Sequence, residues 1–87
     1  MIMHINESAE NYLETILMLS KVKPVVRSVD IAEELNFKKS SVSVAMKNLR
    51  LNGYINVNND GHITLTEAGQ RIAEFCKDNA LVIANTL

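Results

Sequence analysis

The sequence predicts a mainly α-helical domain with one small β-hairpin, and three observations carry that prediction. Apolar residues recur at helical spacing in three segments that precede Gly53. From residue 54 to residue 66, apolar and polar side chains alternate instead, as they do in strands. The chain has 87 residues, of which 47% are apolar, so it has the size and composition of a single globular domain, residues 1–87.

The first two predicted helices are bounded by residues that cap or interrupt helices. Ser8 is the predicted cap of the first helix, which should end near Val22 because Pro24 disfavours helical geometry in the residue before it. Ser28 is the predicted cap of a second, short helix, and Asn36 is suited to end it in the left-handed conformation. The apolar stripe of this second helix consists of Ile31, Ala32 and Leu35.

A third helix is expected from about Lys39 to Asn52, with Gly53 directly after its end. Its expected core face follows the spacing i, i+3, i+4, i+7 and consists of Val42, Ala45, Met46 and Leu49. The alternating segments that follow, 54–58 and 62–66, flank the turn-forming sequence Asn59-Asp60-Gly61 and predict a hairpin. The residues expected on one side of the hairpin are Ile55, Val57, Ile63 and Leu65.

Thr66 is the predicted cap of a fourth helix. The expected inner face of this helix consists of Ala68, Ile72, Ala73, Phe75 and Cys76. Cys76 has neither a second cysteine nor a histidine near it in the sequence, so we interpret it as a small core residue. The last residues, 80–87, form an uncharged and mostly apolar tail.

The charge of the chain is divided unevenly. The net charge is -1, but residues 21–50 carry +4 and the remaining residues carry -5. Between Asn36 and Gly53 there are four basic residues and no acidic residue. Such a segment is either a solvated helix face or a surface for nucleic-acid phosphates.

The outer row of the third helix favours the nucleic-acid interpretation. It presents Ser40, Ser43, Val44 and Lys47, which are small or cationic side chains of the kinds that contact bases and phosphates in a major groove. The candidate base contacts are Ser40, Ser41, Val44 and Lys47. The candidate phosphate contacts are Lys38, Lys39, Ser43 and Arg50.

Residues 28–52 also have the spacing of a helix-turn-helix. Ala32 stands where the two helices must approach closely, and Asn36 stands at the turn. The positions expected in the core are Ile31, Leu35, Phe37, Val42 and Ala45. Because a hairpin follows at 54–66 in the position of a wing, the sequence predicts a winged helix-turn-helix.

Five segments follow one another along the chain: Glu10–Ile16, Val29–Leu35, Ser40–Ser43, Leu51–Ile55 and Ile63–Gly69. In sequence and order they resemble the diphtheria toxin repressor family of iron- and manganese-dependent repressors. The resemblance covers roughly residues 7–76. It implies a sequence-specific DNA-binding domain of a transcriptional regulator, expected to be a repressor, whose third helix reads a double-stranded DNA operator.

The same resemblance implies Mn(II) or Fe(II) as effector and a homodimer as the assembly. Glu14 is the only residue that matches a ligand position of the family. Asn11 stands where the family has aspartate or methionine, Ala80 stands where it has histidine, and the following metal-sensing and dimerisation domain is absent from these residues. We therefore expect no metal site and no cofactor in this chain.

Other functions find little support in the sequence. It has no Gly-rich phosphate loop, no pair of nucleophile and base and no carboxylate cluster, so we expect no enzyme. It has no apolar run of the ~18 residues that a membrane span requires. Its single cysteine favours the reducing cytoplasm. Two alternatives remain: a winged-helix module that binds proteins, and a metal-dependent repressor whose sensing domain is missing here.

Overall fold

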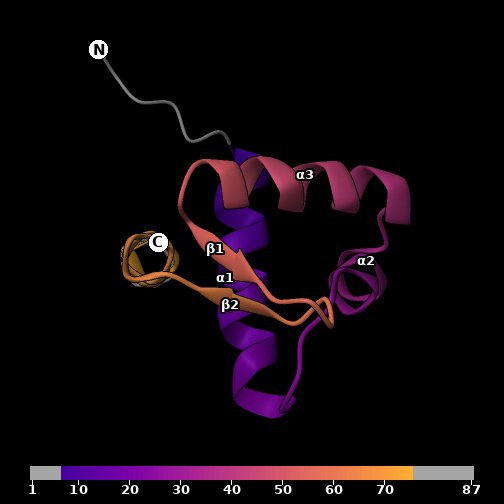
Figure 1. The fold of residues 1–87 in the computed structure, drawn as a ribbon, viewed down its shortest axis with the longest axis horizontal. Helices are drawn as coiled ribbons and strands as arrows, with labels where there is room; N and C mark the ends of the chain where they lie inside the picture. The colour runs from indigo at the N-terminus through magenta and orange to yellow at the C-terminus, as the bar shows by residue number, and fades with distance from the viewer. Residues whose placement is uncertain (1–6, 76–87) are drawn as a thin grey trace, which may run out of the picture.

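The computed structural model describes residues 7–75, which form the predicted order of elements (Figure 1). Helix α1 spans Glu7–Val22, α2 spans Ser28–Leu35 and α3 spans Lys39–Leu51. Strands β1, Ile55–Val57, and β2, Ile63–Leu65, form an antiparallel hairpin. Residues 67–75 are helical and are called the fourth helix here. The predicted fold class, helices with one small hairpin, is confirmed.

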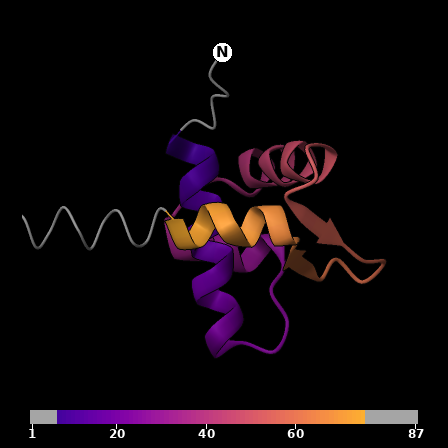
Figure 2. The ribbon, with the colours of Figure 1, turned by 90° about the vertical axis from the view of Figure 1, so that its left-hand side faces the viewer.

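The core gathers apolar side chains from every element. Leu13 and Ile16 of α1 and Ile31 of α2 have no exposed surface. Helix α3 and the remaining segments add Val42, Met46, Leu49, Val26, Ile55, Ile63 and Ala73. The fourth helix lies across α1 (Figure 2), so α1 is enclosed between it and the other elements.

The helix starts differ from the prediction at two serines. Helix α1 begins at Glu7, so Ser8 lies in its first turn rather than in front of it. The residue in front of α2 is Arg27, and Ser28 is the first helical residue. The reason is Asp30, whose Oδ2 accepts a hydrogen bond of 2.8 Å from the Arg27 backbone N–H. The Asp30 carboxylate in the first turn thus satisfies the N–H of the residue in front of the helix, which is the contribution that the third helical residue makes to a capping box.

The turn between α2 and α3 forms as predicted. Asn36 has φ 59° and ψ 43°, and Ala32, which is buried, accepts the closing hydrogen bonds. Phe37 was expected in the core but is 44% exposed. Its ring stands edge-on to the Tyr12 ring at a centroid distance of 5.9 Å, so it covers the core from the rim rather than filling it.

The hairpin has the predicted faces and turn. Ile55 pairs with Leu65 and Val57 with Ile63, and these four side chains are buried or half-buried. At the turn, the Asn58 side-chain oxygen accepts hydrogen bonds from the backbone N–H groups of Asp60 and His62. Gly61 has φ +83°, a conformation that favours glycine.

The predicted cap of the fourth helix is confirmed, whereas part of its inner face was wrong. Thr66 Oγ1 accepts from the Gly69 N–H at 3.2 Å and donates to the Gly53 carbonyl at 2.7 Å. Ala73 is fully buried, but Ala68 is exposed and Phe75 is 64% exposed.

The cause of this difference is Gly69, which packs directly on the backbone of Tyr54, where a Cβ atom would clash with the carbonyl group. That contact turns residues 69, 72 and 73 inward and residues 68 and 75 outward. Cys76 and the tail 80–87 lie outside the described residues.

Candidate nucleic-acid interface

The outward face of α3 is exposed along its whole length. The core face is buried as predicted, with Val42, Met46 and Leu49 at 5% exposure or less and Ala45 half-buried. On the opposite side, Ser40, Ser43, Val44 and Lys47 are all exposed, and Val44 reaches 61%. Leu51, which the sequence analysis did not single out, extends this row and is 70% exposed. The helix carries no acidic residue.

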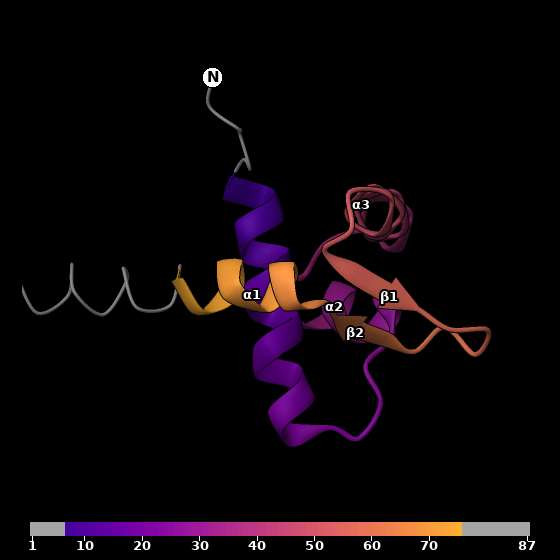
Figure 3. The same cartoon turned by 60° about the vertical axis from the view of Figure 1, so that its left-hand side comes forward.

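A groove of about 260 Å³ lies along one flank of α3. Its other walls are the start of α2 and the hairpin, which projects beside α3 (Figure 3). From α3 the groove is lined by Ser43, Met46, Lys47 and Arg50. From the other walls it is lined by Ser28, Val57, Gly61 and Ile63.

The structure separates the predicted contact residues into four places. Ser43, Lys47 and Arg50 line the groove, whereas Ser40 and Val44 lie on the outward row. Lys38 and Lys39 are exposed at the N-terminal end of α3. Ser41 is exposed but does not line the groove, because at 100° per residue it falls on the flank of Ser40 opposite to Ser43.

Two residues at this surface were missed by the sequence analysis. Ser28 was interpreted only as a cap, yet it lines the groove from the first turn of α2. The Arg27 Nε atom donates a hydrogen bond of 3.0 Å to the backbone carbonyl of Asp60 at the tip of the hairpin. No local signal predicts this bond, because the two residues are 33 positions apart.

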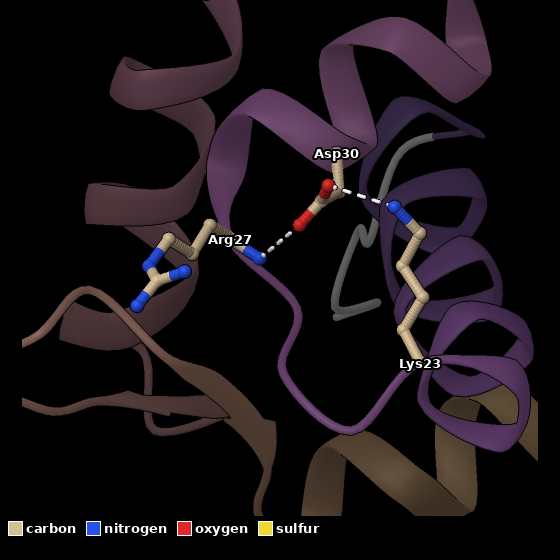
Figure 4. Close-up of polar contacts among 3 residues, drawn as sticks. All are labelled: Lys23, Arg27 and Asp30. Carbon is tan, nitrogen blue, oxygen red and sulfur yellow. Dashed lines mark hydrogen bonds and ion pairs between the residues drawn. The ribbon is translucent and has the colours of Figure 1, made fainter.

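Arg27 is itself held by a small polar network (Figure 4). Asp30 accepts from the Arg27 backbone N–H through Oδ2 and from Lys23 Nζ through Oδ1, the latter at 3.0 Å. The hydrogen bond from the Arg27 backbone, together with that from Lys23, holds the pKa of the Asp30 carboxyl below its ordinary value. The side-chain hydrogen bond to Asp30 raises the pKa of Lys23.

Within residues 7–75, no three His, Cys, Asp or Glu side chains come together as a possible metal site. Glu14 is half-buried, and Asn11, its neighbour on α1, is exposed. Over the same residues, no helix combines the length and the apolar character needed to span a bilayer.

The arrangement as a whole defines a class of protein. A basic, acid-free helix lies exposed after a tight turn, and a hairpin stands beside it with a groove between them. Phosphate-binding cations and small side chains on such a helix are the features of DNA recognition by helix-turn-helix proteins. The fold and the surface are therefore those of a winged helix-turn-helix DNA-binding domain.

Comparison with known families makes the assignment specific. The family model described as "Iron dependent repressor, N-terminal DNA binding domain" matches residues 4–63. The chain therefore belongs to this family of DNA-binding domains of transcriptional repressors, which are not enzymes. The predicted resemblance is confirmed. No curated protein matches the chain.

Solved structures of transcription regulators share the fold of this chain. IdeR of T. acidophilum is 30% identical, with a TM-score of 0.70 over 83% of this chain. A MarR/EmrR family transcriptional regulator from Acinetobacter sp. ADP1 is 29% identical, with a TM-score of 0.66 over 86% of the chain.

MepR, a transcription regulator of the Staphylococcus aureus multidrug efflux pump MepA, is 20% identical over 90% of the chain, with a TM-score of 0.63, and shares the fold. The chain spans 33%, 54% and 63% of these three structures, respectively.

Proposed function

We propose that this domain binds an operator in double-stranded DNA as part of a transcriptional repressor, with α3 in the major groove. Ser40, Ser41, Val44 and Lys47 are the proposed base contacts, of which Lys47 also reaches phosphate. Lys38, Lys39, Ser43 and Arg50 are the proposed phosphate contacts. Because its proposed ligand is operator DNA, the protein is expected to act in the cytoplasm.

The observation that carries this proposal is the exposed side of α3. An apolar side chain that is 61% exposed, Val44, stands between serines and lysines with no acid in the helix. Exposure of an apolar side chain to water is unfavourable. In a major groove, by contrast, the valine contacts thymine methyl groups and the cations lie near phosphates. The groove beside α3 supports the proposal, because two cationic residues, Lys47 and Arg50, line it together with Ser43 and Ser28.

A homodimer is the proposed assembly. Helix-turn-helix dimers place two recognition helices about 34 Å apart, so that each reads one half of a palindromic site. A single α3 with few contacts gives low affinity, and doubling it raises the effective affinity for a two-fold site. Analytical ultracentrifugation with and without a palindromic duplex tests this point, and a monomer on one half-site would contradict it.

We further propose that DNA binding by residues 7–75 does not require Mn(II) or Fe(II). The support for this proposal is the donor set, since within residues 7–75 Glu14 belongs to no group of three or more His, Cys, Asp or Glu side chains that could hold such an ion. The competing hypothesis is a repressor whose metal-sensing part lies outside them. Affinity for duplex DNA that rises on addition of Mn(II) or Fe(II) would favour that competitor.

The decisive experiment is a fluorescence anisotropy titration of a mixed-sequence duplex at several salt concentrations. Lys47→Glu places a negative charge in the groove and should abolish binding, because it replaces attraction to phosphate by repulsion. Lys21→Glu is the matched control, since Lys21 is exposed in the last turn of α1 and does not line the groove. Equal losses in the two variants, or no binding by the unmodified chain, would contradict the proposal.

A further inference from the structure

The hairpin tip, residues 58–62, has no lysine or arginine. It consists of Asn58, Asn59, Asp60, Gly61 and His62, so it cannot attract phosphate as a basic wing does. Its contribution to DNA binding therefore has to come from its position relative to α3. A hairpin of two three-residue strands does not fix its own position, because such hairpins are marginally stable alone.

Two hydrogen bonds connect the neighbourhood of the tip to the segment before α2. The Ile63 N–H donates to the Val26 carbonyl at 2.8 Å, and Arg27 Nε donates to the Asp60 carbonyl at 3.0 Å. The other backbone bonds at the tip stay within the turn, where Asn58 accepts from Gly61. Of the two external bonds, the one from Arg27 is made by a side chain, and it reaches the end of the tip.

The backbone of Arg27 is held in place by hydrogen bonds. Its backbone N–H is bound by Asp30, and Asp30 is bound by Lys23, so the attachment continues from the hairpin through α2 to the end of α1. The backbone N–H of Asp30 also donates to the Arg27 carbonyl at 3.0 Å, so both the N–H and the carbonyl of Arg27 are hydrogen-bonded. A side chain that leaves such a backbone has fewer positions available than one on a free loop.

The bond from Arg27 links two segments that flank the groove beside α3, although neither Arg27 nor Asp60 lines the groove itself. Ser28, the neighbour of Arg27, lines one wall of the groove, and Gly61, the neighbour of Asp60, lines another. The bond between Arg27 and Asp60 therefore connects the two segments that carry these walls, as does the backbone bond from Ile63 to Val26.

We propose that Arg27 is a positioning residue for DNA binding, which holds the hairpin tip against the start of α2 so that the groove beside α3 keeps the shape that receives DNA. This inference rests on the proposed DNA-binding function. It assigns to Arg27 a role that depends on a hydrogen-bond donor at Nε, in addition to any effect of its charge.

Two substitutions separate the donor from the charge. Glutamine carries an N–H donor on the atom that follows Cδ, as arginine does at Nε, but it has no charge. Lysine keeps the charge but has a methylene group at that position. The experiment therefore compares Arg27→Gln, Arg27→Lys and Arg27→Ala with the unmodified chain. Arg71→Gln and Arg71→Lys are matched controls, because Arg71 is exposed on the fourth helix and pairs with Glu67.

The first measurement is hydrogen exchange of the Gly61 and Ile63 amides by NMR. Loss of the donor should accelerate their exchange roughly two- to tenfold in Arg27→Ala and Arg27→Lys, whereas Arg27→Gln should stay near the unmodified chain. The exchange rates of amides in the middle of α3 report whether the fold is intact, and these rates should be the same in all variants. Unchanged exchange of Gly61 and Ile63 in Arg27→Ala would overturn the inference.

The second measurement is affinity for duplex DNA. Positioning predicts that Arg27→Gln binds more tightly than Arg27→Lys. If Arg27→Lys instead binds like the unmodified chain while Arg27→Gln falls as far as Arg27→Ala, the residue acts through charge alone and the inference is overturned. An unmodified chain that binds no duplex overturns the proposed function, and the exchange rates then report separately whether Arg27 holds the tip.

Discussion

Replacing Arg50 by glutamine removes one positive charge from the groove beside α3 while keeping most of the side-chain length. Arg50 is exposed, lines the groove and lies in the last turn of α3, away from the core face. No hydrogen bond or ion pair within residues 7–75 involves its guanidinium group, so the substitution should leave the fold intact. Any change in DNA binding can then be attributed to the lost phosphate contact.

The expected salt dependence of the affinity follows from the number of cations at the interface. Four of them, Lys38, Lys39, Lys47 and Arg50, are exposed on or next to α3. If each neutralises one phosphate, log Kd should rise with log salt with a slope of about 3.6 per protomer. Raising the salt from about 50 mM to about 200 mM should then weaken binding about 150-fold in the unmodified chain and about 40-fold in Arg50→Gln.

The assay is the anisotropy titration on a mixed-sequence duplex, repeated across this range of salt. Arg71→Gln provides the control, because it removes the same charge from a helix that does not line the groove. The affinity ratio between the unmodified chain and Arg50→Gln should shrink about 3.5-fold as salt rises, and the ratio for Arg71→Gln should stay constant. A slope that Arg50→Gln does not change would refute the assignment of Arg50 to phosphate.

Three further substitutions test base readout, packing and capping. Val44→Ala should reduce the preference for a duplex selected from a random pool by about 1–3 kcal/mol, and an equal loss on random duplex would contradict base contact. In urea denaturation, Gly69→Ala should cost about 1–3 kcal/mol or more because its Cβ meets backbone. Gly53 has open space around it, so Gly53→Ala should lower the free energy of unfolding by only about 1 kcal/mol, which is the cost of an alanine at a φ of +81°. If Gly69→Ala destabilised the fold less than Gly53→Ala, the packing argument would be contradicted. Asp30→Ala should cost about 1 kcal/mol at neutral pH, with Glu33→Ala as control. Because the folded state lowers the Asp30 pKa, that cost should persist above pH 3.8 and vanish as the pH falls toward the lowered pKa, and a cost independent of pH would exclude the carboxylate as its source.

Much of the fold could be predicted because the signals are local. The end of α2 at Asn36, the end of α3 before Gly53 and the cap at Thr66 each depend on residues within one helical turn. The inner and outer faces of α3 follow from the spacing of its apolar residues, so the exposure of Ser40, Val44 and Lys47 could be predicted too.

The errors occurred where a distant segment decides the outcome. Thr66 fixes where the fourth helix begins, but the packing of Gly69 on the Tyr54 backbone fixes which way it faces, and Phe75 is therefore exposed. Arg27 rather than Ser28 precedes α2, because Asp30 binds the Arg27 backbone N–H. Periodicity averages over several turns and carries no information on such single contacts.

The sequence by itself determined the order of elements, the basic and acid-free character of α3 and the family to which the chain belongs. These properties reside in the spacing and type of neighbouring residues, which exist before the chain folds. Only the tertiary structure decided that Ser43, Lys47 and Arg50 share a groove with Ser28 and the hairpin, and that Arg27 reaches Asp60. Those contacts join residues far apart in the chain, and their geometry is fixed only when the core has packed.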